Sequence, residues 1–172
     1  TNGTLLKSYA KQLALAGLHR VNVSLDSMDP FKYTWITRGG RLDDALEGID
    51  AAVENGLKPV KINCVVKESK DEPDARMVTS YAERKGLEIR YIRQMDLERG
   101  EFRAVEGGEG GNCDRCNRLR LTSDGKVKPC LFSDLEYDVR KLGAQQAIKE
   151  ALENKPACGT INHGGHFYYI GG

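Results

Sequence analysis

Helical and extended segments alternate along the first hundred residues, and this alternation restricts the possible folds more than any other feature. Apolar residues recur at helical spacing in 4–16, 43–55 and 73–85, and runs rich in valine and isoleucine lie in 20–25, 59–66 and 88–93. Successive parallel strands need crossover connections, which are usually helices. The sequence therefore predicts an α/β fold with a parallel sheet, of barrel or open type.

The sequence also predicts the N-cap and the apolar face of the first helix, and the strand ends at which functional residues should lie. Thr4 is the predicted N-cap of the first helix. The apolar face of that helix is predicted to comprise Leu5, Leu6, Tyr9, Leu13 and Ala16. Chemistry in such folds gathers at the carboxyl ends of the strands. Those ends lie near Ser24, Asp26, Asn63 and Met95.

Residues 97–111 are rich in glycine and poor in apolar side chains, so they are predicted to connect two regions, 1–96 and 112–172. In the second region, an alternating segment, the turn signal Asp124-Gly125 and a second alternating segment predict a β-hairpin. This hairpin would bring Cys130 back beside Cys116. A helix over about 144–154 and a glycine-containing tail follow.

Cys113, Cys116 and Cys130 lie within eighteen residues and predict a metal or cluster site. Three thiolates can hold a metal ion or an iron–sulfur cluster while leaving one coordination position free for a ligand. The same spacing suits a structural zinc site completed by His163 or His166, so both interpretations stay open at this point.

Arg118 and Arg120 directly follow the second of these cysteines. At positions i and i+2 of a predicted strand, both side chains would project from one face, with Leu119 and Leu121 on the other. Like charges held side by side repel unless an anion lies between them, and guanidinium groups match phosphate and carboxylate oxygens. We interpret the pair as an anion site; the alternative is two solvated surface arginines.

Composition argues against several classes of protein. The 26 basic and 25 acidic residues leave a net charge of +1, without the field that drives nonspecific nucleic-acid binding. No apolar run approaches the length of a membrane span. Five cysteines, three of them clustered, indicate a reducing compartment, and no signal peptide precedes the first helix, so a cytoplasmic location is expected. Cys64 and Cys158 are interpreted as buried thiols that bind nothing.

Five strings, namely RVNVSLDSMD, PVKIN, IRYIRQM, CDRCNRLRLTSDGKVKPCL and the terminal IGG, resemble molybdenum cofactor biosynthesis protein A in this order. That family comprises the radical S-adenosylmethionine (SAM) GTP 3',8-cyclases, and the resemblance covers nearly the whole chain. It implies a partial, TIM-like (β/α) barrel followed by a small α+β region that binds an auxiliary [4Fe–4S] cluster.

The resemblance also implies roles for individual residues. The implied ligands of the auxiliary cluster, whose free iron would bind the guanine of GTP, are Cys113, Cys116 and Cys130. The implied nucleotide contacts are Lys61, Arg118 and Arg120. The implied SAM contacts are Ser24 and Met95. The terminal Gly171 and Gly172 resemble a flexible tail that enters the active site in the family.

Two features depart from the family pattern. The family's radical-generating [4Fe–4S] cluster needs a Cys-x-x-x-Cys-x-x-Cys motif, which this sequence lacks. The chain is therefore expected to be a fragment, inactive alone, that covers the second part of such an enzyme. The stretch between Met95 and Cys113 is also shorter than is usual.

Two alternatives stay open beside the cyclase. One is a radical SAM enzyme whose auxiliary cluster serves another substrate, and the other is a non-catalytic, zinc-stabilised module. The family resemblance further implies a possible homodimer.

Overall fold

The computed structural model describes residues 1–96, 99–108 and 110–164, and these residues form two compact units. The first unit contains residues 1–94 and 105–108, and the rest of the described chain belongs to the second. Residues 105–108 return to the first unit through Glu106, which pairs in antiparallel fashion with Tyr91. Within the described ranges, no helix is both long and apolar enough to cross a membrane.

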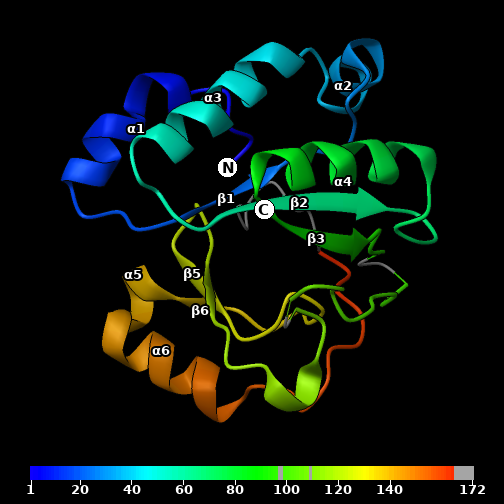
Figure 1. The fold of residues 1–172 in the computed structure, drawn as a ribbon. Helices are drawn as coiled ribbons and strands as arrows, with labels where there is room; N and C mark the ends of the chain where they lie inside the picture. The colour runs from blue at the N-terminus through cyan, green and yellow to red at the C-terminus, as the bar shows by residue number, and fades with distance from the viewer. Residues whose placement is uncertain (97–98, 109, 165–172) are drawn as a thin grey trace. The chain divides into compact units, whose positions relative to one another are not determined.

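The first unit is built on a three-stranded parallel sheet, which confirms the predicted α/β class. Its strands follow the order β1 (Val21–Ser24), β2 (Val60–Val66) and β3 (Glu88–Arg93). Its main helices are α1 (Leu6–Leu15), α3 (Leu42–Glu54) and α4 (Pro73–Lys85). These helices lie on one side of the sheet, as Figure 1 shows.

The two faces of this sheet differ in chemistry. The face towards the helices carries fully or nearly fully buried apolar side chains, among them Val23, Ile62 and Cys64. The alternate residues of the strands point to the other face. On that second face the described side chains include Asn22, Ser24, Lys61, Asn63, Glu88 and Arg90. One side of the sheet therefore forms the core, and the other side is polar.

Local sequence explains the best-predicted helix. Pro73 lies at the first position of α4, where its missing N–H costs no hydrogen bond. Gly86 ends the helix with φ of 64°, in the left-handed region that glycine adopts most easily. Two basic residues in the last turn, Arg84 and Lys85, complement the helix dipole.

The predictions for α1 need correction. Leu5 occupies the N-cap position without a side-chain cap, and the Thr4 hydroxyl instead donates to Asn2 Oδ1 at 2.6 Å. Leu6 and Ala10 are buried, whereas Leu5 and Tyr9, both assigned to the apolar face, are exposed. The buried stripe is narrower than predicted because α1 packs on α3 rather than on the sheet.

A further helix, α2 (Pro30–Ile36), is absent from the sequence prediction. It is only seven residues long, and its Asp29 N-cap accepts a hydrogen bond from the Lys32 N–H at 2.7 Å. Two of its large side chains, Phe31 and Trp35, are exposed. A helix this short, with exposed apolar residues, lacks the periodic signal on which the prediction depended.

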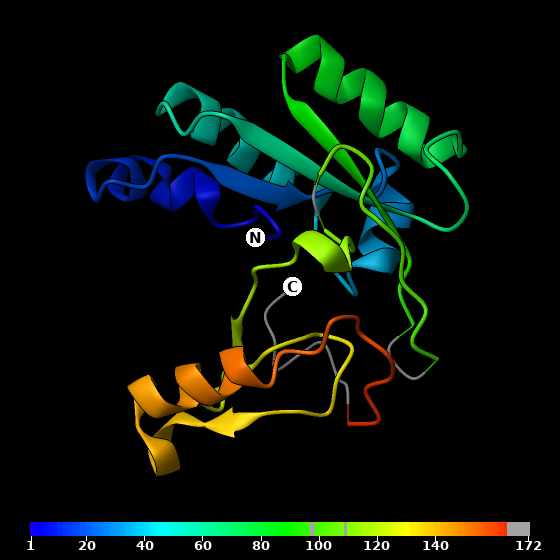
Figure 2. The same ribbon diagram turned by 90° about the horizontal axis from the view of Figure 1, so that it is seen from below.

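The second unit contains the predicted hairpin and a third strand that the sequence did not reveal. An antiparallel sheet has the order β4 (Arg120–Leu121), β5 (Lys126–Lys128) and β6 (Tyr137–Asp138). Its helices are the 3₁₀ helix η1 (Cys113–Arg115), α5 (Val139–Leu142) and α6 (Ala144–Glu153). Figure 2 shows α6 beside this sheet, where Ala147 and Ala151 bury their methyl groups against Val127.

Candidate functional site

The three predicted ligand cysteines, Cys113, Cys116 and Cys130, lie in the second unit, before and after the hairpin. Cys113 opens η1, and the Cys116 N–H donates to the Cys113 carbonyl at 3.1 Å, which closes a tight turn between the two thiols. Cys130 follows β5, whose register pairs Lys128 with Arg120. The antiparallel pairing thus returns the chain towards Cys116, as the sequence predicted.

Lys155 makes hydrogen bonds to both cysteine-bearing segments. Its ammonium group donates to the Arg118 carbonyl at 2.9 Å and to the Pro129 carbonyl at 2.5 Å. A hydrogen bond from the Arg118 backbone N–H and the nearby charge of Lys155 hold the pKa of Cys116 below its usual range. Cys116 is therefore biased towards the thiolate, which is the form that binds metals.

The two remaining cysteines differ from each other. Cys64 is fully buried in β2, which confirms the predicted burial, and this burial raises the pKa of its thiol to about 12. Cys158 is exposed, and its Sγ lies 3.2 Å from Cys113 Sγ. The interpretation of Cys158 as a buried thiol is therefore wrong.

The donor chemistry of this region fits an iron–sulfur cluster. Among the described residues, no three histidine, cysteine or acidic side chains converge on one point as the ligands of a single metal ion do. In a four-iron cluster, however, each thiolate binds a different iron, so the sulfurs need not converge in this way. Glycine at position 159 also leaves space beside Cys130, because an added Cβ would lie 3.0 Å from its sulfur.

The histidines suggested for a zinc site are placed differently. His163 Nδ1 lies 2.8 Å from Asp134 Oδ2, and its backbone N–H donates to the other oxygen of the same carboxylate. This pairing lowers the pKa of Asp134 and engages Nδ1 of the ring; it does not involve Nε2, the other nitrogen that can bind a metal. His166 lies outside the described residues, as do Gly171 and Gly172 of the predicted tail.

Arg118 and Arg120 lie beside the cysteines, although not both on a strand. The ladder begins at Arg120, so the prediction that the two arginines share a strand face is wrong, and Leu121 is exposed while Leu119 packs in the core. Burial and the charge of Arg118 lower the pKa of Arg120, whereas the sulfurs of Cys130 and Cys116 act in the opposite direction. The guanidinium groups therefore lie close enough to repel each other and to feel the thiolates.

Lys61 and Ser24 lie on the polar face of the first unit's sheet. Ser24 is paired in register with Asn63, and the largely buried Lys61 forms an ion pair with Glu88 on the neighbouring strand. Asn63 Oδ1 and Arg90 Nε are buried on the same face without a hydrogen-bond partner in the described part of the chain. Such orphaned groups mark a place where a polar ligand would be stabilised.

The sequence prediction did not include Asn63 and Arg90 as site residues. The sequence pattern indicated these two residues in part, because Asn63 and Arg90 occupy alternate positions of predicted strands, on the same face as Lys61. Only the packed structure showed that Asn63 Oδ1 and Arg90 Nε are buried with no partner among the described residues.

Met95 belongs to the second unit, where it packs with Phe102, Leu131, Phe132 and Cys130. The two phenylalanine rings stack with centroids 4.3 Å apart. The thioether is thus held among apolar groups next to a predicted cluster ligand. The structure does not test its predicted contact with SAM, which stays a prediction.

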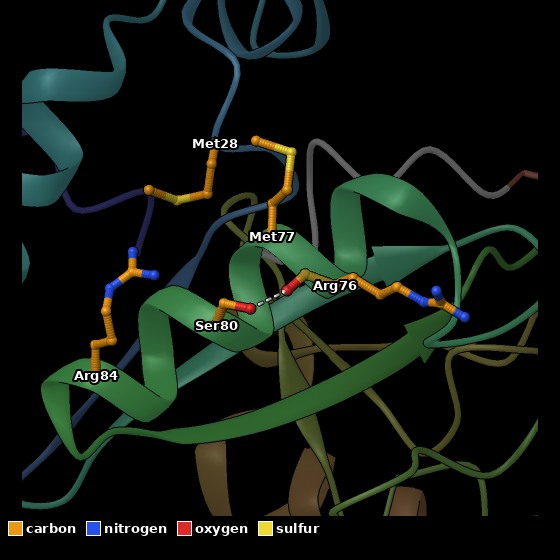
Figure 3. Close-up of a pocket in the computed structure, with 5 residues that line it drawn as sticks. All are labelled: Met28, Arg76, Met77, Ser80 and Arg84. Atoms are coloured by element: carbon orange, nitrogen blue, oxygen red, sulfur yellow. Dashed lines mark hydrogen bonds between the residues drawn. The ribbon is translucent and has the colours of Figure 1, made fainter.

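A shallow pocket of about 270 Å³ opens along α4, away from the predicted site residues of the same unit. Its lining consists of Met28, Arg76, Met77, Ser80 and Arg84. Figure 3 shows the two methionines side by side above the helix and the Ser80 hydroxyl donating to the Arg76 carbonyl at 3.0 Å. None of these residues was predicted to bind a ligand.

Two family models match overlapping parts of this chain. Residues 1–77 match the model of the Radical SAM superfamily. Residues 67–159, more than half of the chain, match the family model described as Molybdenum Cofactor Synthesis C. The chain belongs to this molybdenum cofactor synthesis family, which confirms the resemblance inferred from its motifs.

Curated relatives agree with this assignment. A protein of Thermodesulfovibrio yellowstonii named GTP 3',8-cyclase is 37% identical, over 88% of this chain and 61% of its own length. A protein of Petrotoga mobilis with the same name is 34% identical, over 98% of this chain and 66% of its own length. The chain thus spans a little under two thirds of the length of these relatives.

Proposed function

We propose that this chain is part of a radical SAM GTP 3',8-cyclase of molybdenum cofactor biosynthesis. In this proposal the first unit contributes to a partial (β/α) barrel, and the second unit is the auxiliary-cluster region. The observation that carries the proposal is the neighbourhood of clustered thiols and two arginines in one unit. The relatives named GTP 3',8-cyclase support the choice of reaction.

Cys113, Cys116 and Cys130 would hold the auxiliary [4Fe–4S] cluster, which when bound would offer an open iron to the guanine of GTP. The chain's own residues prepare this site. The Arg118 backbone N–H and Lys155 favour the Cys116 thiolate, so less proton release is needed when the ligand binds iron.

Arg118 and Arg120 would bind the phosphates of the nucleotide. Two guanidinium groups held close together repel each other, so they gain free energy when an anion binds between them. Arg120 is partly buried, so its attraction to a phosphate is screened less by solvent than that of a surface arginine. The pair would therefore contribute both affinity and orientation.

The polar face of the first unit's sheet would supply the remaining contacts. Lys61 would reach the nucleotide, and Ser24, together with Met95 of the second unit, would contact SAM. The unpartnered Asn63 Oδ1 and Arg90 Nε support a polar ligand on this face. The protein's contribution would be to position the reacting groups and to exclude water from them.

A second candidate is a zinc-stabilised module, favoured by the position of Cys158 beside Cys113. Four cysteines suffice for a closed structural zinc site. A third candidate, a radical SAM enzyme with another substrate, rests on the short segment between the two units. These candidates predict different metal contents and different ligands.

Nucleotide binding by the chain itself tests the proposal. The chain would be reconstituted anaerobically with iron and sulfide, and calorimetry would compare GTP with ATP and with a peptide. We expect selective binding of GTP, weakened about tenfold or more in Arg118→Ala and Arg120→Ala because each loses a charge-assisted hydrogen bond. Arg140→Ala, which removes an exposed charge from α5 of the same unit, should bind GTP normally.

Other outcomes of the same experiments would contradict the proposed function. A colourless chain that retains zinc under these conditions would support the second candidate, and preference for the peptide would support the third. The reaction itself would be assayed on the complete gene product with SAM, reductant and GTP. Failure to form both 5'-deoxyadenosine and a cyclised nucleotide would reject the cyclase. Gel filtration of the same protein would test the predicted homodimer.

A further inference from the structure

Two thiols of the second unit lie close enough to form a covalent bond with each other. Cys158 Sγ is 3.2 Å from Cys113 Sγ, and both cysteines are free thiols. The S–S distance in a disulfide is about 2.05 Å, so small side-chain rotations that bring the sulfurs about 1 Å closer would suffice. Such a bond needs only these two sulfurs. The pair therefore has the separation that disulfide formation requires.

The chain on both sides of Cys158 is anchored to the rest of the unit. Before it, Lys155 donates to carbonyls on both cysteine-bearing segments. After it, the Thr160 N–H donates to the Phe132 carbonyl at 2.9 Å. Gly159 packs directly on the same residue, because an added Cβ would lie 2.6 Å from Phe132 Cβ. The fold has therefore already supplied most of the ordering that a bond between the two sulfurs needs.

A reagent in solution can reach this pair of thiols. Cys158 is exposed, and Cys113, at the start of η1, is partly exposed. Cys64 differs in this respect, because it is fully buried in the core of the first unit. Thiol oxidation depends on access as well as on proximity, and the pair formed by Cys113 and Cys158 offers both.

We propose that Cys113 and Cys158 form an oxidation site, at which a small-molecule disulfide converts the two thiols into an intrachain disulfide. One protein thiolate attacks the reagent, forms a mixed disulfide and releases one small thiol. The other protein thiolate attacks the mixed disulfide and releases the second small thiol. The protein thiols are oxidised by two electrons and the reagent is reduced by two, and the two protein protons end on the released thiols.

This oxidation would control the loading of the metal group, a consequence that rests on the proposed function. Cys113 is one of the three proposed cluster ligands, and a sulfur held in a disulfide offers no thiolate to iron. The oxidised chain would keep only Cys116 and Cys130. Cluster binding and the disulfide therefore exclude each other, and reduction of the bond restores the three ligands. Cys158 itself binds no iron, so the cluster keeps its open coordination position.

Peptide mapping of the metal-free chain tests the oxidation site directly. The reduced chain would be incubated with glutathione disulfide, its remaining thiols alkylated, and the protein digested with trypsin in the absence of reductant. Trypsin cuts after Arg115, so Cys113 and Cys116 fall in separate peptides. We expect one dominant link, between the peptides that carry Cys113 and Cys158, and its loss on treatment with dithiothreitol.

Two variants supply the controls. Cys158→Ser removes the exposed thiol, so mixed disulfides with glutathione should accumulate in place of the link. Cys64→Ala removes a thiol from the core of the first unit and should form the link as the unaltered chain does. A lasting glutathione adduct on Cys158 of the unaltered chain, or a dominant link between Cys113 and Cys116, would overturn the proposal.

Iron content separates this proposal from the proposed function. After reconstitution with iron and sulfide without added thiol, the oxidised chain should lose most of the iron that the reduced chain takes up. Dithiothreitol should restore that iron. Equal iron in the oxidised and reduced chains would overturn the control of loading. If the link forms but the reduced chain takes up no iron, the oxidation site stands and the proposed function fails.

Discussion

Replacement of Lys155 by methionine should loosen the cysteine-bearing hairpin of the second unit. The change keeps most of the apolar stem of the side chain but removes the ammonium group that bonds to the Arg118 and Pro129 carbonyls. Each hydrogen bond from a charged donor contributes about 1.5–3 kcal/mol, and the lower end applies here because one of the two bonds is exposed. We therefore expect a local loss of about 2–3 kcal/mol.

Hydrogen exchange read by mass spectrometry measures this loss where it occurs. In the metal-free, reduced chain, amides of residues 126–131 should exchange about 30 to 150 times faster in Lys155→Met, since 1.4 kcal/mol corresponds to a factor of ten. Lys149→Met is the matched control. That lysine is also in the second unit, and its ion pair among the described residues is an exposed i,i+4 contact with Glu153 at 3.8 Å, worth about 0.5 kcal/mol at most.

The same variant should change the chemistry of Cys116. The charge of Lys155 helps to lower the pKa of this thiol, so its removal should shift the pH profile of Cys116 alkylation to higher pH. If Lys155→Met exchanges hydrogen no faster than Lys149→Met and leaves the alkylation profile unchanged, then Lys155 does not connect the two segments.

Three further predictions concern the first unit, each measured by urea unfolding followed by circular dichroism. Gly48→Ala should destabilise by about 1–3 kcal/mol although alanine favours helices, because its Cβ would lie 2.1 Å from the Gly3 carbonyl oxygen; a gain in stability would contradict the close helix packing. Burial raises the pKa of the Asp26 carboxyl, because the folded protein favours its uncharged form. The contribution of Asp26 to the free energy of unfolding is therefore complete at the lowest pH and is lost as the pH rises through the folded-state pKa. Asp26→Asn keeps an acceptor for the Val65 N–H, so its stability relative to the unaltered chain should rise across this acidic window; a pH-independent difference would refute the assignment. Tyr91→Phe should cost about 1 kcal/mol, since its hydroxyl lies 2.6 Å from a threonine hydroxyl on α4, and no loss would mean that water replaces the bond.

Local signals in the sequence were sufficient for the long elements. Strand β3 and helix α4 occupy the predicted residues because alternation, an initial proline and a terminal glycine are all encoded within a few positions. Helix α2 and strand β6 were missed for the opposite reason. They are too short to show a periodic pattern, and β6 is defined by its pairing with β5 rather than by its own residues.

The candidate site likewise has features that local sequence predicts and features that depend on long-range packing. The neighbourhood of Cys116 and Cys130 was predictable because a hairpin turn relates them directly. The strand assignment of Arg118 was wrong because alternation does not say where a two-residue ladder begins. The position of Cys158 was misjudged because its contact with Cys113 spans forty-five residues and arises from packing around Lys155 and Asn162.

The sequence by itself determined the family, the parallel α/β class, and the set of thiols and arginines that could hold a cluster and an anion. These depend on residue types and on spacings along the chain, which need no folding to read. Only the tertiary structure showed that Cys158 lies beside Cys113 and which buried polar atoms have no partner among the described residues. Burial and long-range contacts depend on distances in space, and segments far apart in sequence set those distances when they pack.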